Sequence, residues 1–571
     1  MMRNMEVAWA FSETANLMEI AGEDGFRSRA YRQAARAIAN LDEDIEELSA
    51  QGRLREIPGI GRELEKKISQ LLATGSFPAY DRLREKVPPG LVAMLQLPGL
   101  GAKSVRLIYE QLGITTLDEL EAAARRHQVR ELPGLGSKTE LGILRGIEML
   151  RGRGGRVPLG LAQPLGEELN GFLNSLPPVA GAVLAGSVRR GCDLVGDVDL
   201  VAAAADEEAE TVVQSFIRHP KVKDIIEIDS HRALIRSFLG VKVELVVVHP
   251  RDFLLTVFRS TGSRAHLKAL EEFAAGRDLK FTFPANLNSV VEFEKMIYSG
   301  LGLDYIVPEL REGGGEIAAA ASGSLPQLVR LKDVRGDLHL HTSWSDGVNS
   351  LEQLVAAAKA RGYQYIAITE HSKSLAISRG LNEERLRGQV EEIRRLNRQE
   401  KDFHILTGIE VDILGNTTLD LPDDLLAELD LVIASIHSGF RQEPERITER
   451  IMAALENPHV DILAHPTGRM LARREPYTFD LKKVLQTAVK TKTALEINAS
   501  PDRLDLSAEN ARRFVELGGY LAINTDAHDS RRLEDMKYGV ITARRGWVEA
   551  GRVINTWPLA KLLRWLKQRL V

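Results

Sequence analysis

The stretch Tyr365-Ile-Ala-Ile-Thr-Glu-His371 is one of seven apolar runs after residue 336 that carry His, Asp or Glu at or near their ends. The other six are Asp337-Leu-His-Leu-His341, Ile405-Leu-Thr-Gly-Ile-Glu410, Leu431-Val-Ile-Ala-Ser-Ile-His437, Asp461-Ile-Leu-Ala-His465, Ala494-Leu-Glu-Ile-Asn498 and Tyr520-Leu-Ala-Ile-Asn-Thr-Asp-Ala-His528. Helical stretches, such as Gln353 to Arg361, lie between most of these runs. This alternation predicts a parallel barrel, in which the loops after the strands build the active site.

The polar residues of these runs have the composition of a metal site. His339 and His341 alternate along one strand and therefore point the same way, as do Asp526 and His528. The set of nine candidate ligands is completed by Asp346, His371, Glu410, His437 and His465. A single histidine is more often structural than a ligand, but six of the eight histidines after residue 330 collect at or just after strand ends. This shared position favours metal binding.

Nine ligands are too many for one ion and suit two or three. Mixed imidazole and carboxylate ligands favour Zn²⁺ or Mn²⁺ over Mg²⁺ or Ca²⁺. Such ions lower the pKa of a bound water and stabilise both oxygens of a phosphodiester displacement. His404 and His459 precede their strands, so we expect them at the other end of the barrel, without a role. Four arginines in loops after ligand strands are either phosphate-binding groups or surface charge, namely Arg379, Arg469, Arg473 and Arg474.

A motif repeated three times occupies the N-terminal quarter of the chain. The copies are Ile57-Pro-Gly-Ile-Gly61, Leu97-Pro-Gly-Leu-Gly101 and Leu132-Pro-Gly-Leu-Gly136, and each precedes a helical stretch. The exposed amides at such a helix start can hold a phosphate oxygen. The repeat is typical of the helix-hairpin-helix motif, which binds a DNA backbone without reading its sequence. The expected contact residues are Gly59, Gly61, Gly99, Gly101, Gly134 and Gly136.

Carboxylates gather again in the middle of the chain. Asp197 and Asp199 lie two residues apart on an expected strand, so both face the same side. The next strand, over residues 241–248, offers Glu244 as a third carboxylate. The turn Gly186-Ser-Val-Arg-Arg-Gly191 comes just before, with Ser187 and Arg190 placed to hold a triphosphate. Together these residues indicate an all-oxygen Mg²⁺ site for two-metal phosphoryl transfer.

These motifs resemble a known family. The region up to about residue 315 resembles a family X DNA polymerase of the β-like, gap-filling type. The whole chain resembles the bacterial form that carries a C-terminal PHP (polymerase and histidinol phosphatase) domain, including the start of that domain at Arg335-Gly-Asp-Leu-His-Leu-His-Thr-Ser-Trp-Ser-Asp-Gly347. The resemblance implies a multidomain α/β protein with all-α helix-hairpin-helix domains, a β-like nucleotidyltransferase palm and a distorted (β/α)7 PHP barrel.

The resemblance also implies domain boundaries. We expect an 8-kDa-like helical domain over residues 1–85, a second helix-hairpin-helix domain over 86–153 and the palm over 154–250. A nucleotide-selection subdomain over 251–315 and a linker over 316–334 would precede the PHP domain at 335–571. Two Gly-rich stretches, 151–156 and 311–316, are expected to connect domains, and the three arginines of the first are equally consistent with phosphate contact.

By the same resemblance the chain is a DNA-repair enzyme. It would fill gaps with the palm, using Mg²⁺ or Mn²⁺, and process 3′ ends with two or three Zn²⁺ or Mn²⁺ ions in the PHP domain. Asp197 and Asp199 would bind both palm ions and Glu244 the ion at the primer 3′-hydroxyl, while Gly186, Ser187, Arg190 and Gly196 would contact nucleotide phosphates. The PHP activity would be a 3′→5′ exonuclease, with abasic-site endonuclease and 3′-phosphatase as open alternatives. The expected partners are gapped or nicked DNA and dNTPs, bound by a monomer.

Lys67 occupies the position of a lyase nucleophile in β-like polymerases, where it would form a Schiff base with an abasic sugar. Such chemistry requires a neutral amine. A phosphate-binding or solvated lysine is the alternative interpretation.

Several positions depart from the polymerase pattern. Glu244 replaces the usual Asp and is one methylene longer. Arg259 and Ser260 stand where the family has two aromatics beneath the nucleotide sugar, and Leu267 replaces an Asn on the minor-groove edge of the base. The family's Leu-Asn-Glu-Tyr-Gly turn is absent around Lys280 to Asn288. Phosphate and metal contacts are retained while sugar and base contacts are lost, which predicts a weakened or lost polymerase.

Composition sets the remaining bounds. The net charge is −5, so DNA binding must come from local features. The single cysteine, Cys192, excludes a disulfide within the chain and, with no signal-peptide pattern in the first 26 residues and no apolar run of 18, favours the cytoplasm. The rival hypotheses are a small-molecule phosphatase of the histidinol-phosphate type, a polymerase-dead DNA-binding nuclease and a non-catalytic DNA-binding scaffold.

Overall fold

The computed structural model describes residues 2–23, 25–39, 41, 43–95, 97, 99–152, 155–275 and 289–567. The chain divides into two compact units. Unit 1 contains Met1–Val157, Ala162–Val183 and Gly196–Pro250, and unit 2 contains Pro158–Leu161, Leu184–Val195 and Arg251–Val571. The stretch from Lys280 to Asn288, where the family's Leu-Asn-Glu-Tyr-Gly turn is absent from the sequence, lies outside the described residues. None of the described helices is long and apolar enough to cross a membrane.

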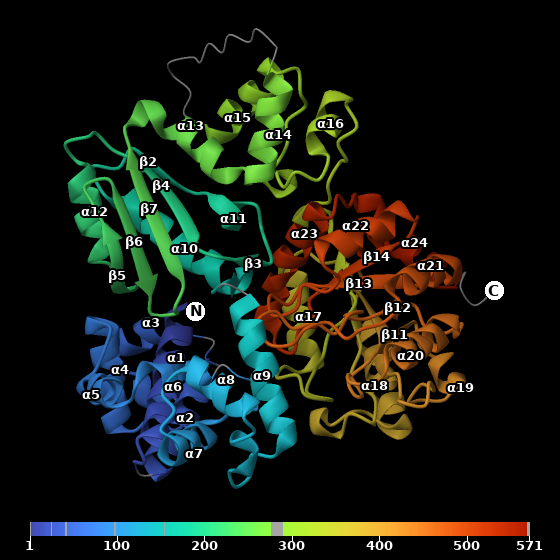
Figure 1. The fold of residues 1–571 in the computed structure, drawn as a ribbon. Coiled ribbons are helices and arrows are strands. Elements are labelled where there is room, and N and C mark those ends of the chain that lie inside the picture. Colours follow the sequence, from blue (N-terminus) through green and yellow to red (C-terminus); the bar gives the residue numbers. More distant parts are fainter. Residues whose placement is uncertain are drawn as a thin grey trace. The chain divides into compact units, whose positions relative to one another are not determined.

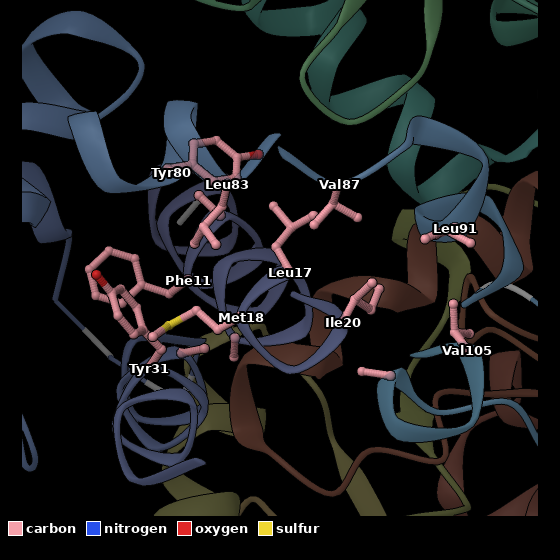
Figure 2. Packing of buried hydrophobic residues seen from close by; sticks show 14 of the residues in the cluster. Phe11, Leu17, Met18, Ile20, Tyr31, Tyr80, Leu83, Val87, Leu91 and Val105 are labelled. Carbon is pink, nitrogen blue, oxygen red and sulfur yellow. The ribbon is translucent and has the colours of Figure 1, made fainter. Parts of the chain in front are cut away.

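Unit 1 begins with a helical bundle around α1 (Met2–Ile20). Phe11, Leu17 and Met18 of this helix are fully buried, and Figure 2 shows them within the apolar core of the bundle. The ring of Phe11 packs edge-on against that of Tyr31, with centroids 5.2 Å apart. The surrounding helices are α2 (Gly25–Ala39), α3 (Ile45–Ala50), α4 (Arg62–Thr74), α5 (Pro78–Lys86), α6 (Pro89–Met94), α7 (Ala102–Leu112), α8 (Leu117–Arg125) and α9 (Ser137–Gly152).

The three Pro-Gly repeats form the same turn. Their first glycines have left-handed φ angles of 85° at Gly59, 83° at Gly99 and 80° at Gly134, which favour glycine. In each repeat the second glycine directly precedes a helix, so that α4, α7 and α9 start at the next residue. The expected hairpin geometry is therefore confirmed in all three copies.

The palm contributes a five-stranded sheet in the order β2-β4-β7-β6-β5. β4 runs parallel to β7, whereas β6 is antiparallel to β7 and to β5. Along β7, Val243, Leu245 and Val247 are buried and alternate with more exposed residues, so Glu244 lies on the opposite face from these three apolar side chains. The bounds are β2 (Gly181–Leu184), β4 (Val198–Ala203), β5 (Val222–Ile228), β6 (Arg232–Ser237), β7 (Lys242–Val248), α10 (Leu159–Ser175) and α12 (Ala209–Ile217).

Unit 2 contains a nearly closed barrel of seven parallel strands that pair in sequence order. A parallel bridge between Leu340 and Ala527 joins the first strand region to the last. The side chain of Asn555 donates to the carbonyls of Gly336 and Ile523, on the same two strands, at 2.9 and 2.6 Å. The strands are β8 (Gly336–Asp337), β9 (Tyr365–Ile368), β10 (His404–Asp412), β11 (Leu431–Ser435), β12 (Ile462–Leu463), β13 (Ala494–Asn498) and β14 (Leu521–Asn524). All seven predicted strands are confirmed, although β8 is short and ends before His339.

Helices cover the outside of this barrel (Figure 1). One end of the barrel is filled by apolar side chains that include Trp557 and Trp565, and the Tyr365 hydroxyl at the start of β9 donates to the Trp557 carbonyl at 2.8 Å. The other end is left for polar residues. The helices are α17 (Leu351–Ala360), α18 (Glu383–Asn397), α19 (Asp423–Leu426), α20 (Pro444–Glu456), α21 (Leu481–Thr491), α22 (Ala508–Glu516), α23 (Met536–Arg545) and α24 (Leu559–Lys567).

A smaller helical group in unit 2 precedes the barrel. It contains the fully buried pair of Arg311 and Glu294, whose side chains form two hydrogen bonds of 2.8 and 2.7 Å. Glu316 is also fully buried and lies 2.7 Å from the His266 ring. Arg311 and Glu316, at the two ends of the Gly-rich stretch 311–316, are therefore buried and paired with distant helices, which its composition does not reveal. The helices are α13 (Pro250–Thr261), α14 (Arg264–Ala274), α15 (Val290–Gly300) and α16 (Glu316–Ala321).

Short elements complete the described structure. They are α11 (Gly186–Arg189), β1 (Val157–Pro158), β3 (Leu194–Val195) and the 3₁₀ turns η1 (Leu54–Glu56), η2 (Val129–Glu131), η3 (Pro308–Leu310), η4 (Leu331–Asp333), η5 (Ala376–Ser378), η6 (Ser530–Asp535), η7 (Ala550–Arg552) and η8 (Ile554–Thr556).

Replacing Gly336 by Ala tests the closure of the barrel. A Cβ atom at this position would lie 2.2 Å from the Tyr365 carbonyl oxygen on the adjacent strand, which cannot move without breaking the sheet. We expect Gly336→Ala to lower the free energy of unfolding by about 1–3 kcal/mol, as overpacking does. Gly551→Ala is the control, because a Cβ there has no atom within 4 Å. Equal denaturant midpoints for the two variants would contradict the expectation.

Candidate metal centre and nucleotide site

The structure brings the nine predicted ligands together at the carboxyl ends of the barrel strands. Their side chains come from the segments that follow β8, β9, β11, β12 and β14 and from β10 itself. Three overlapping groups have ligand atoms within 4.8 Å of one another: His341, Asp346, His371 and His528; His339, His341 and Asp526; and His371, Glu410 and His437. His404 is the first residue of β10, whereas Glu410 lies near the end of that strand, so His404 is at the opposite end of the barrel, as expected.

Glu410 lies at the centre of this cluster. Its Oε2 atom is 3.5 Å from Nε2 of His339 and 3.8 Å from Nε2 of His341. Its Oε1 atom is 3.4 Å from Nε2 of His437 and 3.1 Å from Nε2 of His465. The two oxygens thus face different histidines, an arrangement in which one carboxylate can bridge two ions.

Two aspartates extend the cluster. Oδ1 of Asp526 is 3.2 Å from Nε2 of His341 and 3.6 Å from Nε2 of His339. Oδ1 of Asp346 is 3.3 Å from Nε2 of His528 and 3.6 Å from Nε2 of His371. The side chains of His528 and Asp346 are 33% and 31% exposed, so the cluster opens to solvent on their side.

Buried atoms without partners show that a cation fits here. Within the described residues, Nε2 of His339 and both ring nitrogens of His341 are buried and have no hydrogen-bond partner. Nδ1 of His371 and Oε2 of Glu410 are also buried and lie 2.6 Å from each other, without the geometry of a hydrogen bond. An unsatisfied buried polar group costs about 1–3 kcal/mol. Four imidazole nitrogens and a carboxylate oxygen are ligands that a divalent transition metal accepts. The cluster can therefore bind divalent metal ions.

The charged groups of the cluster shift one another's pKa values. Burial lowers the pKa of His339, but the carboxylates of Glu496, Asp526 and Glu410 outweigh this effect and raise that pKa well above its usual value. Burial raises the pKa of Glu410, yet the nearby histidines hold it well below the ordinary range. For His341, burial and the neighbouring histidines lower the pKa well below its usual value.

Sequence reasoning missed Glu496, which holds the His339 ring. Its Oε1 atom lies 2.7 Å from Nδ1 of His339, and its Oε2 atom accepts the backbone N–H of His465 at 2.8 Å. Asn498 and Asn524 also donate to this carboxylate, at 3.2 and 3.1 Å. A carboxylate on the far nitrogen fixes the tautomer and orientation of a ligating imidazole. The only signal in the sequence was a glutamate inside the sixth apolar run.

A second missed residue is the fully buried Glu370. It accepts the backbone N–H of Thr342 at 3.0 Å, the side-chain amide of Gln389 at 2.9 Å and the hydroxyl of Ser345. These bonds hold the turn that carries Asp346. The residue stands directly before His371 in the sequence, where alternation alone would have directed it away from the ligands.

The four arginines predicted near this site differ in their contacts. Arg379 and Arg473 are exposed. Arg469 donates to the backbone carbonyls of Arg503 (3.0 Å) and Leu504, which commits it to the neighbouring loop. Arg474 is half-buried, with its guanidinium 4.2 Å from the Phe440 ring centroid. The phosphate-binding hypothesis is therefore least suited to Arg469.

In the palm, the strand register brings the predicted carboxylates to one place. Asp199 on β4 pairs with Glu244 on β7, and Asp197 directly precedes β4. Burial and the charge of Glu244 raise the pKa of Asp197, which places these two acids close together. Oε1 of Glu244 accepts a hydrogen bond from Arg232 on β6. The third carboxylate is thus already paired with a cation.

The predicted phosphate-binding turn forms the start of α11. Gly186 has a left-handed φ of 59°, and the Ser187 carbonyl accepts the N–H of Cys192 at 3.0 Å. Arg190 donates from Nε to Glu312 at 2.9 Å and from Nη1 to the Thr261 carbonyl at 2.9 Å. A phosphate would have to compete with Glu312 for this guanidinium. Gly196 has open space around it, since an added Cβ would meet no atom within 4 Å.

The helical bundle leaves its hairpin turns uncovered. All six predicted DNA-contact glycines are exposed. A Cβ added at Gly61, Gly99, Gly101, Gly134 or Gly136 would meet no atom within 4 Å. Lys67 on α4 is half-buried, with its ammonium 5.1 Å from the Tyr31 ring centroid. Its role as a lyase nucleophile stays a prediction.

Models of known protein families match three separate parts of the chain. Family models match for a helix-hairpin-helix domain at residues 2–77, a SAM-like helix-hairpin-helix tandem at 92–148 and a PHP domain at 337–525. A probable phosphatase of Thermoanaerobacter sp. (strain X514) is 29% identical over 41% of this chain and 94% of its own length. A probable phosphatase of Shewanella loihica is 28% identical over 41% of this chain and 93% of its own.

One relative matches along the full length. The DNA polymerase/3′-5′ exonuclease PolX of Bacillus subtilis (strain 168) is 37% identical over 575 residues, which cover 99% of this chain and 100% of that protein. This match includes both helix-hairpin-helix regions and the PHP domain, and the chain belongs to the PolX family of family X DNA polymerases that carry a PHP domain.

Proposed function

We propose that this chain is a DNA-repair enzyme that fills gaps with its palm and degrades DNA from the 3′ end with its PHP barrel. The observation that carries the nuclease assignment is the cluster of nine ligands with buried, unpartnered atoms on the same chain as three exposed hairpin turns. The full-length similarity to a DNA polymerase/3′-5′ exonuclease supports both activities. Gapped or nicked DNA and dNTPs are the proposed substrates, and a monomer is the proposed state.

The barrel would hold two or three ions, proposed to be Zn²⁺ or Mn²⁺. The distances favour His339, His341 and Asp526 with Oε2 of Glu410 for one ion, and His437 and His465 with Oε1 of Glu410 for the next. Asp346, His371 and His528 would hold the third. Bound ions of this kind supply hydroxide at neutral pH and neutralise charge on a phosphodiester.

The chain's own residues prepare this site for a DNA end. Glu496 keeps Nε2 of His339 directed at the cluster, and Glu370 keeps the turn before Asp346 in place. The open side, next to Asp346 and His528, is where a 3′-terminal nucleotide would enter. Burial of the remaining ligands limits water there, which strengthens electrostatic interactions with a phosphate.

The palm would bind Mg²⁺ or Mn²⁺ at Asp197, Asp199 and Glu244 and the triphosphate at Gly186, Ser187, Arg190 and Gly196. We expect this activity to be weakened. Glu244 is longer than the usual Asp and is held by Arg232, and Arg259 and Ser260 are exposed rather than packed aromatics. Leu267 offers no hydrogen bond to a base.

The rival function is hydrolysis of a small phosphate ester, since probable phosphatases match the barrel. These relatives cover 41% of the chain and 93–94% of their own length, so a barrel alone suffices for them. Here the barrel shares its chain with three exposed hairpin turns that a small substrate does not need. This combination favours DNA as the substrate.

A pair of variants separates the two activities. On one labelled gapped duplex, Asp197→Ala is expected to abolish synthesis and spare degradation, because it removes a palm ligand only. His341→Ala should do the reverse, since it removes a nitrogen from the metal cluster. His404→Ala, at the other end of β10, should change neither. Loss of degradation in Asp197→Ala would contradict the assignment of two independent sites.

Metal removal tests the barrel chemistry. Elemental analysis of unchelated protein should find two or three Zn²⁺ or Mn²⁺ ions per chain, fewer in His341→Ala. A chelator should abolish degradation of single-stranded DNA, and adding back the metal should restore it. Turnover on histidinol phosphate, measured in parallel, should be far lower. Metal-free protein that still degrades DNA would exclude the proposed site, and faster histidinol phosphate hydrolysis would favour the rival.

Glu244→Asp tests why synthesis is weakened. A displacement of about 1 Å at a reacting centre costs on the order of a hundredfold in rate. Shortening the side chain also frees it from Arg232, so primer extension on gapped DNA should accelerate about tenfold or more. Glu227→Asp, which changes the other carboxylate paired with Arg232, is the matched control. Robust extension by the unmodified chain with no gain in the variant would contradict this explanation.

A further inference from the structure

Arg503 lies in the loop between β13 and α22, beside the metal cluster. The loop is tied down on one side, because Arg469 donates to the carbonyl of Arg503 at 3.0 Å and the Leu471 N–H donates to that of Asp502 at 2.6 Å. The Arg503 N–H itself donates to the Ser500 carbonyl at 2.8 Å. The backbone that presents this side chain is therefore fixed.

The guanidinium stands next to Asp526 without a hydrogen bond to it. Its Nε atom is 3.8 Å from Oδ2 of Asp526, beyond hydrogen-bond range. That oxygen accepts its bond from the Asn498 side chain at 3.1 Å instead. Oδ1 of the same carboxylate faces His341 at 3.2 Å. Arg503 is therefore a neighbour of the candidate metal ligand Asp526.

One end of this guanidinium is buried and unsatisfied. The side chain is only 18% exposed, and its Nη1 atom is buried with no hydrogen-bond partner among the described residues. A buried, charged N–H donor without an acceptor costs free energy unless a ligand accepts its hydrogen bond. A second guanidinium is near, because burial and the charge of Arg503 lower the pKa of Arg474. An anion would satisfy the donor and relieve the repulsion.

We propose that Arg503 binds a non-bridging oxygen of the phosphate that is cleaved or released at the barrel site. This rests on the proposed nuclease function of the same site and names the group that recognises its substrate. A guanidinium is the side chain best suited to this task, since its planar donors match phosphate oxygens. Arg503 follows the one strand of the barrel that carries no ligand, so ligand spacing in the sequence does not point to it.

Binding of thymidine 5′-monophosphate to the metal-loaded, full-length chain tests the proposal by calorimetry. Arg503→Ala should weaken binding about tenfold or more, with unchanged metal content. Arg503→Lys keeps the charge but not the planar donors and should restore binding in part. Arg513→Ala is the matched control, because Arg513 is exposed on the following helix and pairs with Glu509. On single-stranded DNA, Arg503→Ala should raise KM more than it lowers kcat.

Unchanged nucleotide affinity in Arg503→Ala, or no measurable affinity in the unmodified chain, would overturn the proposal. Loss of metal from both Arg503 variants would also overturn it, because Arg503 would then support Asp526 rather than phosphate. If the unmodified chain binds the nucleotide through Arg503 but does not degrade DNA, the phosphate site stands and the exonuclease function fails.

Discussion

Parallel pairing of seven strands in sequence order is the constraint on which the metal centre depends. Side chains as distant in sequence as His339 and His528 can meet only because every strand ends at the same edge of the barrel. The bridge between Leu340 and Ala527 brings the first strand region next to the last. Asn555, which lies outside the sheet, donates hydrogen bonds to both strands. Without this closure, Asp526 would not reach the nitrogens of His339 and His341.

Closure of the barrel also buries several carboxylates, and neighbouring imidazoles stabilise their ionised forms. Buried carboxylates such as Glu410 and Asp526 are costly to ionise alone, but the surrounding imidazoles hold the pKa of each well below its usual value. Glu496 adds charge from behind and fixes the His339 ring. The unsatisfied nitrogens that remain point to cations as the missing partners. The same imidazoles and carboxylates therefore stabilise one another in the fold and form the candidate metal site.

In the palm, two of the predicted site residues are paired with other charged side chains. Its strand register aligns Asp199 with Glu244, but Arg232 competes for the third carboxylate and Glu312 competes for Arg190. In contrast, no cation side chain forms a hydrogen bond in the described structure to Glu410, the central barrel ligand, apart from the histidines that surround it. This difference in pairing is a physical reason to expect the barrel activity to be the stronger one.

Much of this protein is determined by local sequence. Strand and helix periodicity specified the seven barrel strands, and the Pro-Gly repeats specified three turns whose positive φ angles need glycine. The nine candidate ligands were also identified, because alternation along strands and position at strand ends are local properties. The similarity to PolX agrees with this architecture over the whole chain.

Only the tertiary structure decided which further groups reach the site. Glu496, Glu370 and Arg503 act across strands or loops that are distant in sequence, so no spacing rule identifies them. The same holds for Arg311 and Glu316, which lie in a Gly-rich stretch and are buried against distant partners. Local patterns determine where strands begin and which way a side chain faces. Burial and pairing depend on what packs opposite, and that is settled only when the chain folds.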